Sequence, residues 1–419
     1  MGLLARIFRS ALDTDLIHGN RGWNPLGSGE SFVAGVSTTS GVTVTCESAM
    51  RNSAVWRAVV LKTSLMGMFP CKVYQRLPND SRRQAREHPN SRLLHTRPNP
   101  WQTPYQFRSM VEGHRITQGN AFVALIRNRA GVITRMVPLH PKRVTVEIDS
   151  GGMPQYIVSR GHHEKPIPLG WMEVMHLTGP SLSGFLGLST VDHAAEAIGI
   201  SQAGEEYAAR IYSSGGSMRG ALKNKGPELT ADRRRHLKEA WQSAYGPNSE
   251  AHKVALLEGD LDWLKIGITP EEAQGLQSRQ HQVVEVGRYW GIPPWLLFEH
   301  SKDTSWGSGI EQTNQAFLTY CTSPDLTNWE QRMLLDLFDD EDIEAGYYPE
   351  FIVEALARGD MNARSAYYKV MREIGVYSVD DILAKENMPL IGGQGGSERC
   401  RPMNWIPIGT TPTSGEPNA

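Results

Sequence analysis

Two adjacent prolines, Pro293 and Pro294, constrain the fold of this chain more than any other feature of its sequence. Proline has no backbone N–H and its ring clashes with the preceding helical turn, so a helix that reaches this pair must end there. Helical periodicity runs over residues 269–289 and returns over residues 310–338. The sequence therefore predicts two long helices joined by a loop at residues 291–309. Such a loop is either an ordinary connection or a segment that a rigid scaffold presents for a function.

Length, charge and cysteine content limit the class of protein. A chain of 419 residues is too long for one core and predicts two to four domains. A formal net charge of -2 excludes a globally basic nucleic-acid binder but permits a locally basic face. The four cysteines are scattered and form no CxxC pair, which predicts neither a zinc site nor a disulfide framework. No apolar run is long enough to span a bilayer, so we expect no membrane partner.

The first half of the chain predicts an α+β domain. Residues 1–48 are rich in Gly, Ser and Thr and predict a flexible arm. A helix is expected over Asn52–Met68, capped by Ser53, and another from Thr103-Pro104 to about Gly119. Alternating segments then predict an antiparallel meander. Its strands are expected at Ala121–Arg127, Ile133–Leu139, Arg143–Ile148, Gln155–Ser159 and Glu173–Leu177.

The second half changes character at Ser189. Residues Ser189–Ser213 are dense in alanine and predict a long helix that other helices can approach closely. A compact β-α-β insert follows, with strands expected near Met218–Asn224, Lys253–Glu258 and Leu261–Ile266, and a helix at Ala231–Tyr245. Basic side chains concentrate there, which indicates either a solvated face or contact with a partner or nucleic acid. They are Arg219, Lys223, Lys225, Arg233, Arg234, Arg235 and Lys238.

Enzymatic motifs are not found in the sequence. It contains no GxxxxGK[ST] phosphate loop and no GxSxG nucleophile elbow. The run His162-His163-Glu164 is a poor metal site, since adjacent side chains on a strand point to opposite faces. We therefore predict no catalytic residue, no cofactor and no metal.

Several short blocks carry a family resemblance when they are taken in order. They are Asn52–Val59, Phe69–Tyr74, Arg97–Pro100, Gln118–Phe122, Pro138–Pro141, Gly184–Ser189, Gly291–Pro294, Ile310–Gln312 and Arg358–Asp360. Over about residues 50–391, these blocks resemble the HK97-type family of phage portal proteins. The segment Ser323–Trp329 departs from the smoother run that is common in the family, and we expect the third long helix to kink there.

The resemblance implies a fold class and a domain order. The fold is α+β, with a wing, a helical stem, a β-α-β clip, a tunnel loop and a helical crown, assembled as a ring. The expected boundaries are 1–48 for the flexible arm, 49–188 for the wing (completed by about 325–352), 189–214 for the first stem helix, 215–268 for the clip, 269–290 for the second stem helix, 291–309 for the tunnel loop, 310–338 for the helix behind it, 353–391 for the crown and 392–419 for a disordered tail.

The resemblance also implies a function. Portal proteins form a ring, typically of twelve copies, at one capsid vertex, through which double-stranded DNA is packaged and ejected. The implied partners are other copies of the chain, the DNA, a terminase, the major capsid protein and a head-tail adaptor. The implied location is the virion, after synthesis in the cytoplasm of a host bacterium. Two competing interpretations are a head-tail adaptor ring protein and an unrecognised nucleic-acid-processing enzyme.

Site residues follow from the same resemblance. The tunnel loop would face the DNA channel, and its candidate residues are Trp295, Phe298, His300, Lys302, Asp303, Thr304 and Trp306. Lys302 and Asp303 roughly balance in charge, which suits a conduit that must not hold DNA tightly. The basic residues of the predicted clip are expected to contact neighbouring copies or partners rather than DNA.

Overall fold

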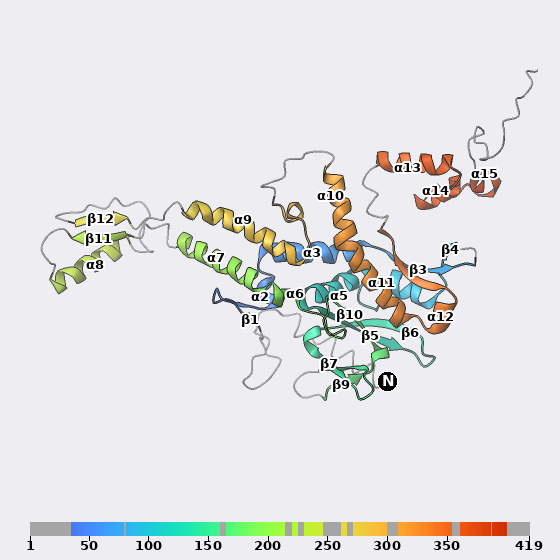
Figure 1. The fold of residues 1–419 in the computed structure, drawn as a ribbon, viewed down its shortest axis with the longest axis horizontal. Coiled ribbons are helices and arrows are strands. Elements are labelled where there is room, and N and C mark those ends of the chain that lie inside the picture. The colour runs from blue at the N-terminus through green and yellow to red at the C-terminus, as the bar shows by residue number, and fades with distance from the viewer. Residues whose placement is uncertain are drawn as a thin grey trace, which may run out of the picture. The chain divides into compact units, whose positions relative to one another are not determined.

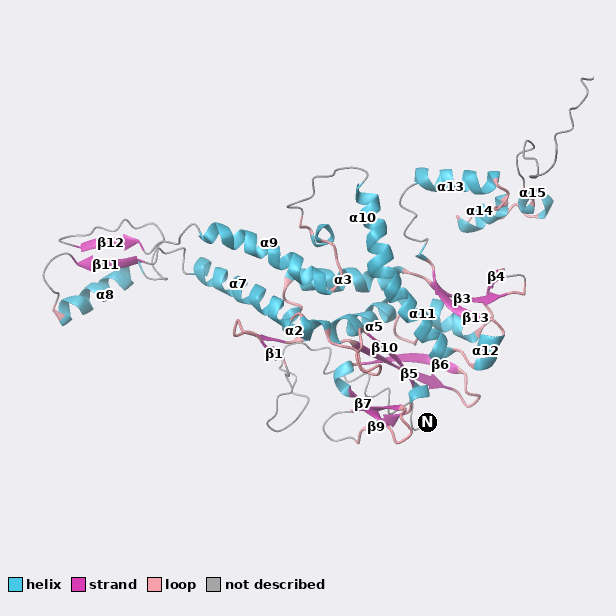
Figure 2. Ribbon diagram, viewed as in Figure 1, coloured by secondary structure: helices cyan, strands magenta, loops and turns pink. Residues whose placement is uncertain are grey.

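A computed structural model describes residues 35–78, 81–159, 165–213, 220–224, 230–245, 261–265, 271–299, 309–353, 361–386 and 388–399. The chain divides into two compact units, Met1–Phe351 and Ile352–Ala419. The larger unit combines helices with separate small sheets, as Figures 1 and 2 show. This mixture confirms the predicted α+β class.

Two helices form the centre of the larger unit. Helix α3 spans Ser53–Met68 and packs along α5, which spans Pro104–Gln118. The predicted cap Ser53 is wrong: Asn52 caps α3, and its side chain accepts hydrogen bonds from the Ala54 and Val55 amides. Asn52 keeps an extended backbone, whereas Ser53 is already helical. For α5 the expected cap Thr103 is confirmed.

Three-stranded antiparallel sheets surround these helices, and the prediction of one continuous meander is wrong. In the described residues, β5 (Asn120–Arg127) is the central strand of the first sheet, between β10 (Val174–Thr178) and β6 (Ile133–Leu139). A second sheet consists of β7 (Val144–Ile148), β8 (Pro154–Val158) and β9 (Ile167–Leu169), and a third of β13 (Tyr347–Phe351), β3 (Cys71–Arg76) and β4 (Arg82–Gln84). The sequence did not predict β9, because three residues centred on a proline show no clear alternation.

The predicted flexible arm is partly ordered. Residues 35–48 include β1 (Val36–Ser37), β2 (Thr43–Val44) and the start of α2 (Cys46–Ala49), so the prediction is wrong for this part. Val44 is completely buried in the main apolar cluster. The Thr39 amide and hydroxyl both donate to the carboxylate of Glu196. These contacts attach the segment to the helix that carries Glu196.

That helix is α7 (Ala195–Ser213), which follows the short α6 (Thr190–His193). Ser189 caps α6, and a turn at Ala194 divides the single helix that was expected over Ser189–Ser213. Helix α9 (Glu271–Tyr289) lies beside α7 (Figure 1). In the insert, β11 (Gly220–Asn224) pairs with β12 (Leu261–Lys265), and α8 spans Ala231–Tyr245. The strand predicted at Lys253–Glu258 lies outside the described residues.

The helix interrupted by Pro324 has an unusual centre. It consists of α10 (Gly309–Phe317), a wide π turn, η6 (Leu318–Thr322), and α11 (Ser323–Leu337). Pro324 cannot donate to the carbonyl four residues before it, and the Ser323 amide instead donates to Leu318 in the wider pattern. The predicted interruption at Ser323-Pro324 is confirmed.

Short segments complete the larger unit. They are α4 (Pro89–Ser91), η2 (Arg92–Thr96), η3 (Pro141–Arg143), η4 (Trp171–Glu173), η5 (Pro294–Leu297) and α12 (Asp340–Glu344). The smaller unit contains α13 (Met361–Glu373), α14 (Val379–Lys385) and α15 (Gly393–Ser397). Ser378 caps α14 as predicted, whereas α15 differs from the expectation of a disordered tail from residue 392.

Candidate functional site

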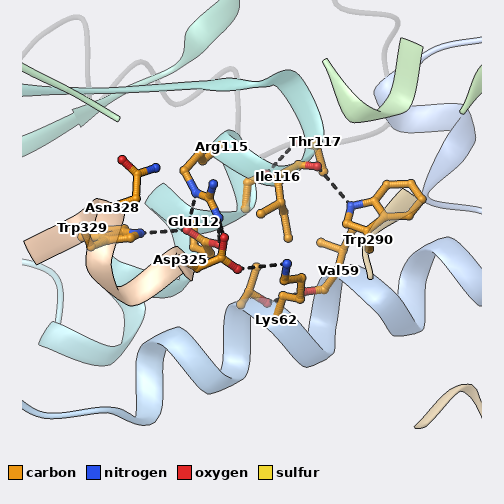
Figure 3. A network of polar contacts seen from close by, with 12 residues as sticks. Val59, Lys62, Glu112, Arg115, Ile116, Thr117, Trp290, Asp325, Asn328 and Trp329 are labelled. Carbon is orange, nitrogen blue, oxygen red and sulfur yellow. Dashed lines mark hydrogen bonds and ion pairs between the residues drawn. The ribbon is translucent and has the colours of Figure 1, made fainter. Parts of the chain in front are cut away.

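The segment after α9 is rooted in the core of the larger unit. Trp290 is 3% exposed and its indole Nε1 donates to the Ile116 carbonyl of α5 at 3.1 Å (Figure 3). Ile292 and Leu297 are buried in the same apolar cluster. Gly291 has a φ of 65°, a left-handed conformation that suits glycine at the end of a helix. The double proline therefore directs the chain into a packed turn before the loop begins.

A basic side chain from α3 holds the end of that turn. Arg57 Nε donates to the Leu296 carbonyl at 3.1 Å, and its guanidinium lies 4.9 Å from the centre of the Phe298 ring. Phe298 has a φ of 62°, which is unfavourable for a residue with a side chain, and it is 72% exposed. Arg57 therefore supports a strained residue at the point where the chain leaves the core.

Trp295 differs from Phe298 in its surroundings. Its side chain is half-buried, and its indole N–H is buried with no hydrogen-bond acceptor among the described residues. On the far side of the loop, Phe317 of α10 is 7% exposed and joins the same cluster as Leu297. Residues 291–309 are thus attached to one core at both ends. The candidates His300, Lys302, Asp303, Thr304 and Trp306 lie outside the described residues.

A buried network of charges fixes the helix that supports the loop. Arg115 of α5 contacts Glu112 and also Asp325 of α11, each at 2.6 Å (Figure 3). Lys62 of α3 reaches Asp325 at 2.9 Å, and Trp329 Nε1 donates to Glu112 at 2.8 Å. The side chains of Glu112 and Arg115 are 1% and 7% exposed. Opposite charges thus join α3, α5 and α11 in the interior, where an unpaired charge would be costly.

A second polar cluster sets the start of α6. The Asn120 side chain accepts from the Gly187 amide and donates to the Gly187 carbonyl, while His176 Nε2 lies 3.0 Å from its Oδ1. A Cβ on Gly187 would lie 2.0 Å from the Gly119 carbonyl oxygen. Burial lowers the pKa of His176 to about 3, so the ring stays neutral. Two backbone segments meet here at a distance that only glycine permits.

A family model described as "Phage portal protein" matches residues 53–387 of this chain. The chain belongs to the phage portal protein family. It is 30% identical to the portal protein of Enterobacteria phage HK97 over 374 residues, covering 88% of this chain and 86% of the relative. It is 29% identical to the probable portal protein of Streptomyces phage phiC31 over 408 residues, covering 94% of this chain and 86% of that relative.

Solved structures support the portal fold. An HK97 family phage portal protein from Corynebacterium diphtheriae matches with a TM-score of 0.56 and 17% identity, over 78% of this chain and 98% of that one. A chain from the neck of an empty gene transfer agent (GTA) particle matches with a TM-score of 0.59 and 20% identity, over 82% and 94% of the two chains. The portal family is structural rather than enzymatic.

The basic residues of the insert in this portal protein are only partly described. Arg233, Arg234 and Arg235 are exposed near the start of α8, where Arg235 pairs with Asp232 at 3.2 Å. Lys223 lies on β11 and Lys238 on α8. Arg219 and Lys225 lie outside the described residues. The structure does not bring these insert residues together with the loop candidates.

Sequence reasoning missed the buried charge network and Arg57. The Glu112/Arg115 pair, three residues apart on a predicted helix, was the only local signal for the network, and such pairs are typical of solvated helix faces. Within the described residues, no three His, Cys, Asp or Glu side chains are grouped as metal ligands. Among those same residues, no helix combines the length and the apolar character needed to cross a bilayer.

Proposed function

We propose that copies of this chain form a closed ring at one vertex of a phage capsid, and that double-stranded DNA passes through the centre during packaging and ejection. Membership of the portal family supports this function. Structures similar in fold come from a GTA neck computed with C12 symmetry and from one computed with C6 symmetry. A ring of twelve copies fits the first of these symmetries. The chain would be made in the host cytoplasm and would then join the virion.

The domain roles follow from this proposal. Residues 49–188 with 325–352 form the wing, α7 and α9 the stem, residues 215–268 the clip, and residues 353–391 the crown. A terminase and a head-tail adaptor dock on the ring, and the major capsid protein surrounds it. The shared core of α3, α6, α7, α9 and η5 supports the assignment of wing and stem to one rigid body.

The attachment of residues 291–309 to the core at both ends is the observation that carries the tunnel-loop role. In a ring, many copies of this loop would face one axis. DNA phosphates attract basic side chains strongly and without regard to sequence, and tight binding would stall movement. The loop would therefore guide DNA by its size and by a near balance of charge at Lys302 and Asp303.

Charge reversal within the loop tests this role. Asp303→Arg should reduce DNA packaging, because it adds a phosphate-binding group to every copy, while rings still assemble. Asp303→Asn is the matched control, since it removes the carboxylate without adding a cation. Negative-stain images should show a ring with a central hole for both variants. A small monomer would contradict the ring, and full packaging by Asp303→Arg would contradict the guiding role of the loop.

The exposed arginines of α8 support contacts between copies or with partners. Replacing Arg233, Arg234 and Arg235 together with glutamate should lower the yield of rings or weaken terminase docking. If rings assemble normally and terminase still binds, while DNA retention falls and becomes less sensitive to salt, the arginines contact DNA instead.

A further inference from the structure

The smaller unit has helices but lacks a core of its own. Among its residues whose burial the structure describes, Ser378 and Gly396 are buried, and no apolar side chain is. Helices in folded proteins hide an apolar face against another element. The contacts within this unit do not provide that cover.

Polar contacts hold α13 against α14. The Tyr368 hydroxyl donates to Glu386 at 2.7 Å, and Arg364 pairs with the same carboxylate at 3.2 Å. Ser378 and Asp381 form a reciprocal cap at the start of α14. These contacts set the geometry of the helix pair and leave its apolar residues outside.

An apolar stripe lies along α13. Tyr367, Val370 and Ile374 are 46%, 51% and 40% exposed, and their spacing places them on one side of the helix. Val370 lies about 160° around the helix from Tyr368, which contacts the Glu386 carboxylate at the end of α14. The stripe therefore faces away from α14.

A second apolar patch follows α14. Met388, Leu390 and Ile391 are 56%, 59% and 66% exposed. Their backbone is nevertheless well held: the Ile391 and Gly392 amides both donate to the carboxylate of Asp380, at 2.8 and 3.1 Å. The Met388 amide donates to the Leu383 carbonyl. Hydrogen bonds thus fix a segment that presents apolar side chains to solvent.

We propose that the α13 stripe of one copy docks on the patch Met388–Ile391 of the next copy around the ring. Head-to-tail rings need two different and complementary surfaces on every copy, and this unit presents two apolar surfaces on different elements. Both surfaces are apolar, and the buried centre of a protein interface is apolar, whereas DNA requires basic groups. This inference rests on the proposed ring.

A cross-linking experiment on the full chain tests the docking. The variant carries Val370→Cys and Leu390→Cys, with Cys400→Ser to remove the nearest native cysteine. Purified rings are treated with a short bis-maleimide and run on a denaturing gel. We expect a ladder of covalently linked chains that extends to the full ring. The matched control, Lys369→Cys with Leu390→Cys, moves the first cysteine off the stripe and should give a much weaker ladder.

The outcomes separate this inference from the proposed function. Rings in the microscope that give only single-chain bands overturn the docking and leave the portal function intact. That result would arise if the larger unit of the same chain covers the stripe. A chain that stays monomeric overturns both. As a second measurement, Val370→Glu should lower ring yield several-fold relative to Lys369→Glu, and equal yields would contradict the docking.

Discussion

Arg115 offers the sharpest test of how the portal core is held together. Arg115→Met keeps the length of the side chain but removes its charge. Glu112 is then left with the Trp329 N–H as its remaining printed donor, at an exposure of 1%, while Asp325 keeps Lys62 at 2.9 Å. Breaking a buried ion pair from one side costs about 3–5 kcal/mol. The free energy of unfolding of a domain is about 5–15 kcal/mol, so this loss is large.

A second substitution should restore much of the stability. Glu112→Gln keeps an oxygen that can accept from Trp329 Nε1 and removes the uncompensated charge. We expect the double variant Glu112→Gln/Arg115→Met to recover more than half of the loss, because removing both charges of a buried pair is often nearly neutral.

Urea unfolding followed by tryptophan fluorescence measures these differences, since Trp329 lies inside the network. Arg288→Met is the matched control. It breaks the exposed pair with Glu285 on α9 and should cost less than about 1 kcal/mol. If Arg115→Met unfolds at the same urea concentration as the control, or if the double variant is no more stable than the single one, the network does not hold the helices as argued.

Three further predictions concern the loop root, the glycine contact and pH. Arg57→Ala should speed protease cleavage between Phe298 and Gly309 by about tenfold, since a hydrogen bond to a charged group contributes about 1.5–3 kcal/mol; Arg57→Lys should lie between, and unchanged cleavage would contradict the role of Arg57. Gly187→Ala should cost at least about 1–3 kcal/mol in thermal or urea unfolding because no Cβ fits, whereas Gly204→Ala, in open space on α7, should stabilise by about 0.5–1 kcal/mol; equal effects would refute the close contact. Burial lowers the pKa of His114 to about 4 from 6.5, so its neutral ring stabilises the fold fully above pH 6.5, and that contribution falls by about 1.4 kcal/mol per pH unit as the pH drops toward 4. The variant with Gln at position 114 should show a shallower decline of stability between pH 6.5 and 4, and an identical slope would contradict this pKa.

Local rules predicted the elements well where one segment determines its own structure. The double proline ends α9, Thr103 caps α5, and Pro324 interrupts the helix behind the loop, each through backbone chemistry that acts within a few residues. The basic insert was likewise predicted as strands around a helix, and β11, α8 and β12 are present.

Contacts between distant segments could not be predicted in the same way. Lys62, Glu112 and Asp325 meet only because three helices cross. The order of residues 35–48 depends on Val44 entering a core that other segments build. Similarly, β10 returns to β5 rather than following β9, because pairing partners in a sheet are chosen by the whole domain. The loop candidates beyond Glu299 remain predictions for the same reason, since their partners are other copies of the chain.

The π turn at Leu318–Thr322 has a consequence for how portal sequences can change. A wide turn holds one residue more than an ordinary helical turn, so deleting a single residue there would leave a continuous helix rather than a break. The deletion would rotate α10 by about 100° relative to α11. Phe317 would then leave the core, and the far end of the tunnel loop would start from a different face of the helix. Length variation by one residue at this turn is therefore a route by which related chains could redirect the loop without altering either helix.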